Sequence, residues 1–160
     1  MTRRFHMNQF ESKLKGYINR NNLDAEHLVF EESCHSVEEA TKAANSSPHD
    51  FVKNVCLIDD NGNLIVAIVK GTDRASTKKI GNALNIAPPR TATPEEILEK
   101  TGYPCGGVPS FGYPAQFLID PRVMEMDVVF TGGGSPNSLV KTSPATLQKA
   151  NKGLVTKIRK

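Results

Sequence analysis

Two glycine-rich segments are the parts of this sequence best suited to holding a ligand. Residues 101–112 contain four glycines and two prolines, and residues 131–137 contain three consecutive glycines followed by Ser-Pro-Asn. Glycine allows close approaches that a Cβ forbids, and proline fixes φ, so each segment should follow a defined path with open backbone. Neither has the Lys-Ser/Thr ending of a P-loop or the Gly-x-Ser-x-Gly of a nucleophile elbow. Their backbone N–H groups could hold an anion or a small ligand, and the alternative is two tight turns.

Lys53 is the side chain with the clearest catalytic potential. It lies near the start of an apolar run, residues 51–58, that is typical of a strand. Alternation along a strand places Lys53 with Val55 and Leu57, and Asn54 with Cys56. An exposed lysine whose stem covers apolar neighbours is the simpler interpretation. If that face lines a pocket, the ammonium could hold a carbonyl oxygen or stabilise a developing oxyanion.

The cysteines and histidines do not form a recognisable site. Three cysteines without regular spacing favour a reducing compartment, and hence a cytoplasmic protein without disulfides. No Cys-x-x-Cys or His-x-x-x-His spacing is present, so we expect no metal and no cofactor. A cysteine nucleophile would need a histidine partner, and we do not expect such a pair. The residues concerned are Cys34, Cys56, Cys105, His27, His35 and His49.

Length and charge favour one globular domain with a mild basic bias. The chain has 160 residues and a formal net charge of +3. No apolar run is long enough to span a membrane. We predict a single domain over residues 7–160, preceded by a disordered extension at residues 1–6. Basic residues gather near the C-terminus at Lys149, Lys152, Lys157, Arg159 and Lys160. They predict either a solvated last helix with a frayed tail or a surface that contacts phosphate.

The elements that must position these residues alternate between helices and strands. Apolar spacing and capping signals predict helices over residues 7–21, 36–44, 76–84, 93–102 and 143–153, with a shorter helical start at 47–50. Strands are expected at 27–31, 51–58, 64–69, 115–119, 126–130 and 138–141. Asn61-Gly62 predicts a tight turn between the second and third strands, and the third is apolar on both faces and therefore central. This pattern predicts an α+β fold with a mixed, mostly antiparallel central sheet surrounded by helices.

The order of these motifs resembles the YbaK family, which includes the editing domain of bacterial prolyl-tRNA synthetases and its stand-alone relatives. The matching pieces cover about residues 23 to 150: Ser36-Val37-Glu38-Glu39-Ala40, Val52-Lys53-Asn54, the Asn-Gly hairpin, Thr72-Asp73-Arg74, Lys78-Lys79, Thr101-Gly102-Tyr103, Gly106-Gly107-Val108-Pro109, Phe130-Thr131-Gly132-Gly133-Gly134 and Ser143-Pro144. The resemblance implies a mixed α/β domain that hydrolyses the ester between a wrong amino acid and its tRNA.

The resemblance also implies a set of site residues. Lys53 matches the family lysine beside the substrate ester and is the catalytic candidate. The implied substrate-binding residues are Asn54, Gly106, Gly107, Val108, Pro109, Ser110, Gly132, Gly133, Gly134 and Asn137. Many relatives carry an aspartate or histidine a few residues after the second glycine run, and residues 135–140 here contain neither, which leaves the choice of amino acid open.

The expected function is therefore a trans-acting aminoacyl-tRNA deacylase that supports translation fidelity. Its substrate would be a tRNA mischarged with a small amino acid such as alanine, cysteine or serine. An aminoacyl ester is already activated, so a positioned water and a polarised carbonyl can suffice. The expected partner is the acceptor end of an aminoacyl-tRNA, with an aminoacyl-tRNA synthetase as a second candidate and no membrane. The alternatives are a non-catalytic module that binds aminoacyl-tRNA or a synthetase, and a hydrolase of another small acyl ester.

Overall fold

The predicted hairpin forms the centre of the molecule. In the computed structural model, which describes residues 7–34 and 36–160, β2 (Val52–Ile58) and β3 (Leu64–Lys70) pair along their whole length in antiparallel register. The Asp59 side chain accepts the N–H groups of Asn61 and Asn63, at 2.9 and 2.8 Å. Of the two central residues of the expected turn, only Gly62 has a positive φ, +80°. Because the loop extends to Asn63, it does not need the tight turn in which both residues are left-handed.

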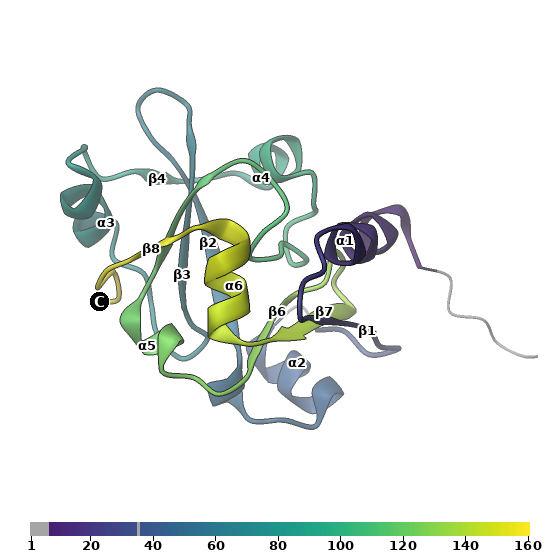
Figure 1. Cartoon of the computed structure of the whole chain (residues 1–160). Coiled ribbons are helices and arrows are strands. Elements are labelled where there is room, and N and C mark those ends of the chain that lie inside the picture. The colour runs from purple at the N-terminus through teal and green to yellow at the C-terminus, as the bar shows by residue number, and fades with distance from the viewer. Residues whose placement is uncertain (1–6, 35) are drawn as a thin grey trace, which may run out of the picture.

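The strands form two sheets (Figure 1). The larger has the order β4-β2-β3-β5-β8, and β3 lies at its centre as predicted. In it, β5 (Gln116–Ile119) runs parallel to β3 and β8 (Leu154–Val155) runs parallel to β5, whereas β4 (Arg90–Thr91) is antiparallel to β2. The smaller sheet is antiparallel, with the order β1 (Glu26–Val29), β7 (Ser138–Thr142) and β6 (Val129–Gly132). The predicted α+β class is confirmed.

The helices are α1 (Gln9–Arg20), α2 (Val37–Ala44), the 3-10 helix η1 (Pro48–Asp50), α3 (Thr77–Leu84), α4 (Pro94–Thr101), α5 (Pro121–Met124) and α6 (Pro144–Asn151). Five of them begin directly after the polar residues at which a helix was expected to start, Ser36, Ser47, Ser76, Thr93 and Ser143, whereas α5, capped by Asp120, was not predicted. At α4, Thr93 and Glu96 form the predicted capping box, and Gly102 closes the helix with a φ of +79°. The last helix ends earlier than expected, because Lys152 takes the left-handed position at +55°.

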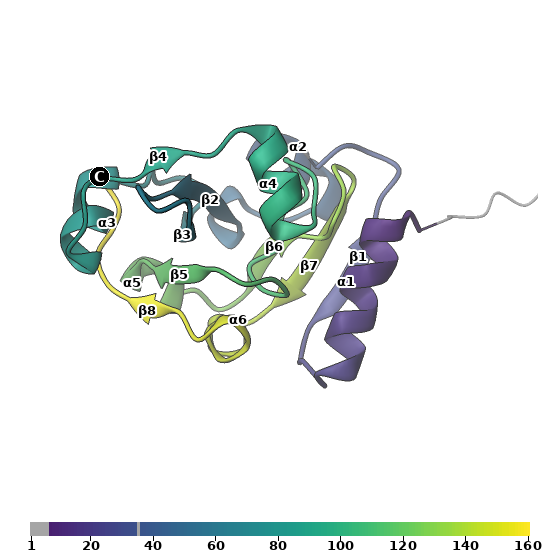
Figure 2. The same ribbon diagram turned by 90° about the horizontal axis from the view of Figure 1, so that it is seen from above.

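Side chains of the hairpin pack on both faces of the larger sheet. Val66 and Ile68 of β3 join the main core, whereas Ile65, Ala67 and Val69 join a second cluster with Ile80 of α3. Figure 2 shows α3 and the chain terminus at one end of the molecule and α1 along the smaller sheet at the other. Among the described residues, none of the helices is long and apolar enough to cross a membrane. The expected extension at residues 1–6 lies outside the described residues, as does His35.

A third apolar cluster joins the two sheets. Phe51, just before β2, bridges to Phe130 of β6, and their rings stack with centroids 5.0 Å apart. Ala40 of α2 and Leu139 of β7 pack in the same cluster. The strand expected at 126–130 begins three residues later, at Val129, and extends to Gly132. The first glycine of the second glycine-rich segment therefore belongs to a strand that faces the start of β2.

Candidate active site

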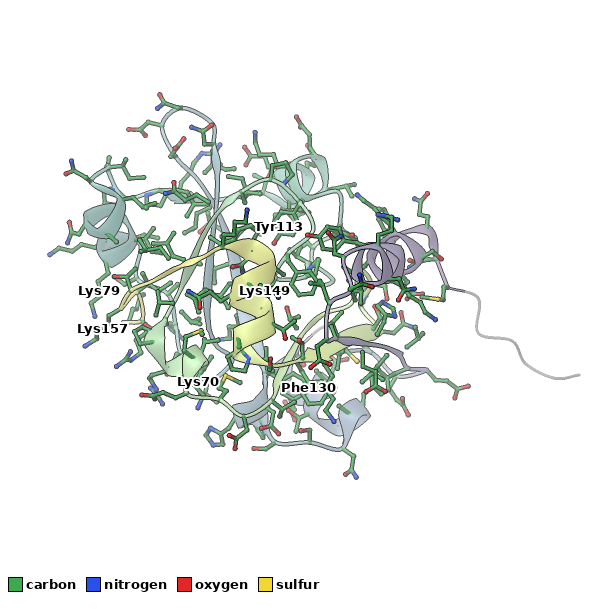
Figure 3. All side chains as sticks on the ribbon, in the orientation of Figure 1. Lys70, Lys79, Tyr113, Phe130, Lys149 and Lys157 are labelled. Atoms are coloured by element: carbon green, nitrogen blue, oxygen red, sulfur yellow. The ribbon has the colours of Figure 1, made fainter. Side chains whose placement is uncertain are left out.

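A cavity of about 210 Å³ lies where the start of β2, α2, the first glycine-rich loop and the β6–β7 sheet meet. Part of its wall is formed by apolar side chains of the third cluster, among them Val37, Phe51 and Leu139. Five of the residues predicted from the sequence line it, namely Lys53, Asn54, Gly106, Val108 and Gly132. Phe130, labelled in Figure 3, lies on the β6 side of the cavity.

Asn54 ties the strand to both glycine-rich segments. Its Nδ2 donates to the Val108 carbonyl and to Thr131 Oγ1, both at 2.9 Å. Its Oδ1 accepts the Ser110 hydroxyl at 2.6 Å, and the Ser110 and Thr131 hydroxyls are 2.7 Å apart. Ser110 and Thr131 are almost completely buried, so these bonds form in a medium where an unpaired polar group is costly. The network fixes the path of the first loop relative to β2 and β6.

The two glycine-rich segments pack backbone against backbone. A Cβ on Gly132 would lie 2.2 Å from the Val108 carbonyl oxygen, and a Cβ on Gly107 would lie 2.5 Å from the Ser135 nitrogen. The Gly134 N–H donates to the Gly107 carbonyl at 2.8 Å. Only glycine permits this approach at Gly107 and Gly132, because any side chain would meet main-chain atoms. The glycines therefore close the wall of the cavity as well as shaping two loops.

The other predicted site residues support the cavity rather than line it. Pro109 is buried, and its carbonyl accepts the Tyr113 hydroxyl at 2.7 Å. Asn137 donates to the Phe30 carbonyl at 2.8 Å and so attaches the second loop to the end of β1. Gly133 accepts a bond from Nε2 of His27 at 2.7 Å. Burial lowers the pKa of His27, which favours the neutral ring that donates this bond.

The N-terminal helix also contacts the second loop. Glu11 is 2% exposed, accepts the Asn8 N–H at 2.9 Å and is hydrogen-bonded to Ser135 Oγ. A Cβ on Gly134, whose φ is +101°, would meet the Phe10 carbonyl oxygen at 2.9 Å. The start of α1 thus fixes the outer side of the loop that Asn137 and His27 hold from the β1 side.

Lys53 lines the cavity, yet its ammonium is held on the other side of the strand. Its Nζ donates to the Asp73 carbonyl at 3.0 Å, while the side chain of Asn54 reaches toward Val108 and Thr131. This is the alternation expected of neighbouring strand residues, and Val55 and Leu57 pack on the Lys53 side as predicted. An ammonium has three donors, so one bond to Asp73 does not exhaust its capacity to bind a carbonyl oxygen.

Sequence reasoning missed several lining residues. Cys34, Cys56 and Cys105 converge on the cavity although 22 and 49 residues separate them. Burial raises the pKa of Cys34 to about 11 and that of Cys56 to about 12, so both thiols stay protonated at neutral pH and are poor nucleophiles. Thr131 was also missed as a site residue. Its position directly before the glycine run was the one available signal.

The cavity can act on a ligand through hydrogen bonds and through steric fit. Its described lining residues include hydroxyl, amide, thiol, backbone and ammonium groups but no carboxylate or imidazole. No group of three or more metal-ligating side chains occurs in the part of the chain that the structure describes. Such a site can orient and polarise a carbonyl compound that is already reactive.

Comparison with known proteins gives one family and one fold. The family model of the aminoacyl-tRNA editing domain matches residues 31–150. YwhH, an uncharacterized protein of Bacillus subtilis (strain 168), is 28% identical over 130 residues, which cover 80% of this chain and 82% of YwhH. A crystallised hypothetical protein is 27% identical with a TM-score of 0.85, over 92% of this chain and 99% of its own. A proposed trans-editing enzyme for prolyl-tRNA synthetase shares the fold, with a TM-score of 0.89 at 23% identity over 97% of this chain and 99% of its own.

Proposed function

Because the chain belongs to the aminoacyl-tRNA editing domain family, we propose that it hydrolyses the ester between a small amino acid and a mischarged tRNA. Water adds across the ester bond, so that the amino acid leaves as its acid and the tRNA recovers its terminal hydroxyl. Residues 7–160 act as one domain and in trans, in the cytoplasm, where tRNA is charged and used. The fold that this chain shares with the crystallised protein described as a proposed trans-editing enzyme supports this proposal.

One observation carries the proposal: Asn54, Ser110 and Thr131 hold two glycine-rich walls around a cavity that Lys53 also lines. A rigid wall of backbone can place an aminoacyl ester without a covalent intermediate. Lys53 then polarises the ester carbonyl and stabilises the oxyanion as water attacks. To do so, its ammonium exchanges its bond to the Asp73 carbonyl for one to the ester and turns to the cavity side of the strand.

The wall of the cavity favours a small, uncharged amino-acid side chain. Val37, Ala40, Cys56 and Leu139 line it, and none of these side chains would compensate a buried charge. A packed wall rejects a larger residue by overlap more effectively than it rejects a smaller one by lost contact. We therefore propose alanine, cysteine and serine as the amino acids removed.

The test is deacylation of alanyl-, cysteinyl- and seryl-tRNA by the wild type and by Lys53→Ala. Selective release that falls tenfold or more in the variant, at an unchanged melting temperature, is the expected result. Lys53→Arg is the matched control for charge, because it keeps the cation but changes its shape and reach. Wild-type rates in Lys53→Ala would remove Lys53 from the mechanism.

A second candidate function is a non-catalytic module that holds aminoacyl-tRNA. Two observations favour it: the ammonium of Lys53 is bound to the Asp73 carbonyl, and the described lining residues offer no general base. Tight binding of aminoacyl-tRNA with no release of amino acid above the rate in buffer would establish this alternative.

A further inference from the structure

The C-terminal segment is fixed to the body of the protein, which corrects the expectation of a frayed tail. After α6, Thr156 donates to the Ile119 carbonyl at 3.0 Å, and Ile158 is fully buried in the second cluster. The Ile158 carbonyl accepts the Ser76 N–H at 2.7 Å, and the Lys160 N–H donates to the Arg74 carbonyl at 2.8 Å. The backbone that carries the basic residues of this segment is therefore held in place before any ligand arrives.

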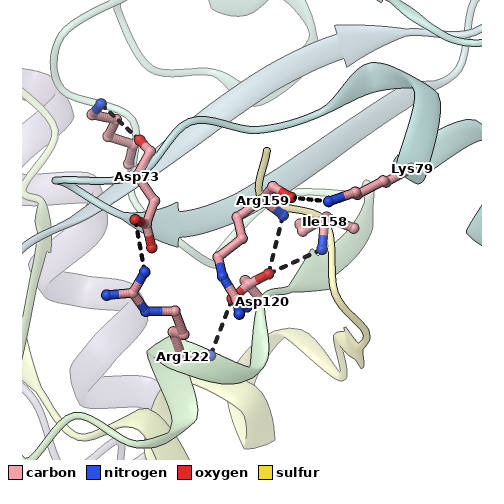
Figure 4. Close-up of polar contacts among 7 residues, drawn as sticks. Asp73, Lys79, Asp120, Arg122, Ile158 and Arg159 are labelled. Atoms are coloured by element: carbon pink, nitrogen blue, oxygen red, sulfur yellow. Dashed lines mark hydrogen bonds and ion pairs between the residues drawn. The ribbon is translucent and has the colours of Figure 1, made fainter.

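Asp120 is the anchor of this segment. It is fully buried, and its Oδ1 accepts the N–H groups of Ile158 and Arg159 at 3.0 and 3.1 Å. Its Oδ2 accepts the Arg159 guanidinium at 2.8 Å and the Arg122 N–H at 3.1 Å (Figure 4). Burial alone would raise the pKa of Asp120, but these hydrogen bonds outweigh it and lower the pKa. The carboxylate is thus used internally and presents no negative charge to solvent.

Basic side chains from four segments gather around the anchored tail. Lys79 of α3 donates to the Arg159 carbonyl at 2.8 Å, and Figure 3 shows Lys70, Lys79 and Lys157 on the side of α3 and α5. Two carboxylates lie among them, Asp73 and Asp120, and each is paired with an arginine. Glu125 and Asp127 follow at the far end of α5. We call this surface the tail face; its cations are Lys70, Arg74, Lys79, Arg122, Lys157, Arg159 and Lys160.

The tail face adjoins the proposed active site at Lys53, which lines the cavity while its ammonium lies on the tail-face side of β2. Arg122 pairs with the Asp73 carboxylate at 3.0 Å, and the Asp73 carbonyl accepts the ammonium of Lys53 at 3.0 Å. Figure 4 shows this chain of contacts running from Asp73 to Arg159. Lys53 therefore lies between the cavity and these cations.

We propose that the tail face binds the phosphate backbone of the tRNA acceptor stem while the 3′ end enters the cavity. The inference rests on the proposed function and adds the surface that carries the nucleic acid. A helical acceptor stem presents regularly spaced phosphates, and an array of Lys and Arg on a fixed backbone binds them with release of counterions. The alternative is a solvated basic surface that binds no ligand.

The experiment compares two pairs of charge reversals at opposite ends of the molecule. Arg74→Glu with Lys157→Glu changes two exposed cations of the tail face, and Lys15→Glu with Arg20→Glu changes two exposed cations of α1 (Figure 1). Both pairs take the formal net charge from +3 to −1, so a non-specific effect of charge would be equal. Binding of uncharged tRNA is measured against salt concentration. The logarithm of the association constant falls linearly with the logarithm of the salt concentration. The tail-face pair should make this negative slope shallower by about 1.4 to 2, and the α1 pair should leave it unchanged.

Hydrolysis of a short substrate separates this inference from the proposed function. An aminoacyl-adenosine carries the ester without a stem, so the tail-face pair should hydrolyse it as the wild type does while losing activity on full-length aminoacyl-tRNA. If no substrate is hydrolysed by the wild type, the proposed function fails, but the binding of uncharged tRNA still tests the surface. Equal loss of tRNA binding in both pairs, or no loss in the tail-face pair, would overturn the inference.

Discussion

Adding one methyl group to Gly132 should separate the two walls of the cavity. In Gly132→Ala, the new Cβ would lie 2.2 Å from the Val108 carbonyl oxygen, and real Cβ contacts are essentially never shorter than 3.0 Å. The Val108 carbonyl or the start of the glycine run must therefore move by about 0.8 Å. The bond from Asn54 Nδ2 to this carbonyl is 2.9 Å long, so the same movement stretches or breaks it.

The expected effect on activity is larger than the effect on stability. Overpacking in a well-packed region costs about 1–3 kcal/mol, which a domain of ordinary stability tolerates. A misplacement of about 1 Å in a group that orients the substrate can cost about 100-fold in rate. Gly132 does not adopt a positive φ, so the alanine brings overlap without backbone strain.

The assay is kcat/KM for deacylation beside the melting temperature, with Gly16→Ala as the matched control. A Cβ on Gly16 of α1 would first meet the flexible end of Arg20, at 3.0 Å, so the same change there should be harmless. Should Gly132→Ala fail to fold, Asn54→Ala tests the same wall by deletion. A folded Gly132→Ala that edits within threefold of wild type would refute the argument that contact between the loops sets the geometry of the site.

Two further predictions concern the side chains that hold the walls. Asn54→Ala removes three hydrogen bonds, while the bond between the Ser110 and Thr131 hydroxyls remains. The free energy of unfolding, measured in urea, should therefore fall by about 2–3 kcal/mol, and a decrease below about 0.5 kcal/mol would contradict the network. Burial lowers the pKa of His27, so the unfolded chain binds more protons just below pH 6.5, and wild-type stability should fall as the pH drops through that range. The loss should be smaller in His27→Gln, and an identical pH dependence of the two proteins would be the contrary result.

Local signals in the sequence were enough for most of the elements. The capping residues Ser36, Ser76, Thr93 and Ser143 each begin a helix, because their side chains satisfy N–H groups that the helix leaves free. The apolar run of β3 is central because both of its faces are buried. The short elements β4, β8 and α5 have too few positions to show periodicity, and they were not predicted.

The site could be predicted only in part, because its polar contacts join distant segments. Ser110 and Thr131 are 56 and 77 residues from Asn54, and no local pattern specifies that their hydroxyls meet its amide. The direction of the Lys53 side chain followed from strand alternation, but its contact with Asp73 depends on the turn after β3. Anchoring of the C-terminal tail depends on Asp120, which is fully buried and contacts Ile158 and Arg159, residues far from it in the sequence.

The measurement that tests the central claim most directly is release of amino acid from alanyl-, cysteinyl- and seryl-tRNA by the wild type and Lys53→Ala. We predict that the wild type releases at least one of the three well above the rate in buffer, and that Lys53→Ala loses tenfold or more of this activity while remaining folded. Absence of release from all three by a folded wild type, or equal rates in the two proteins, would contradict the account.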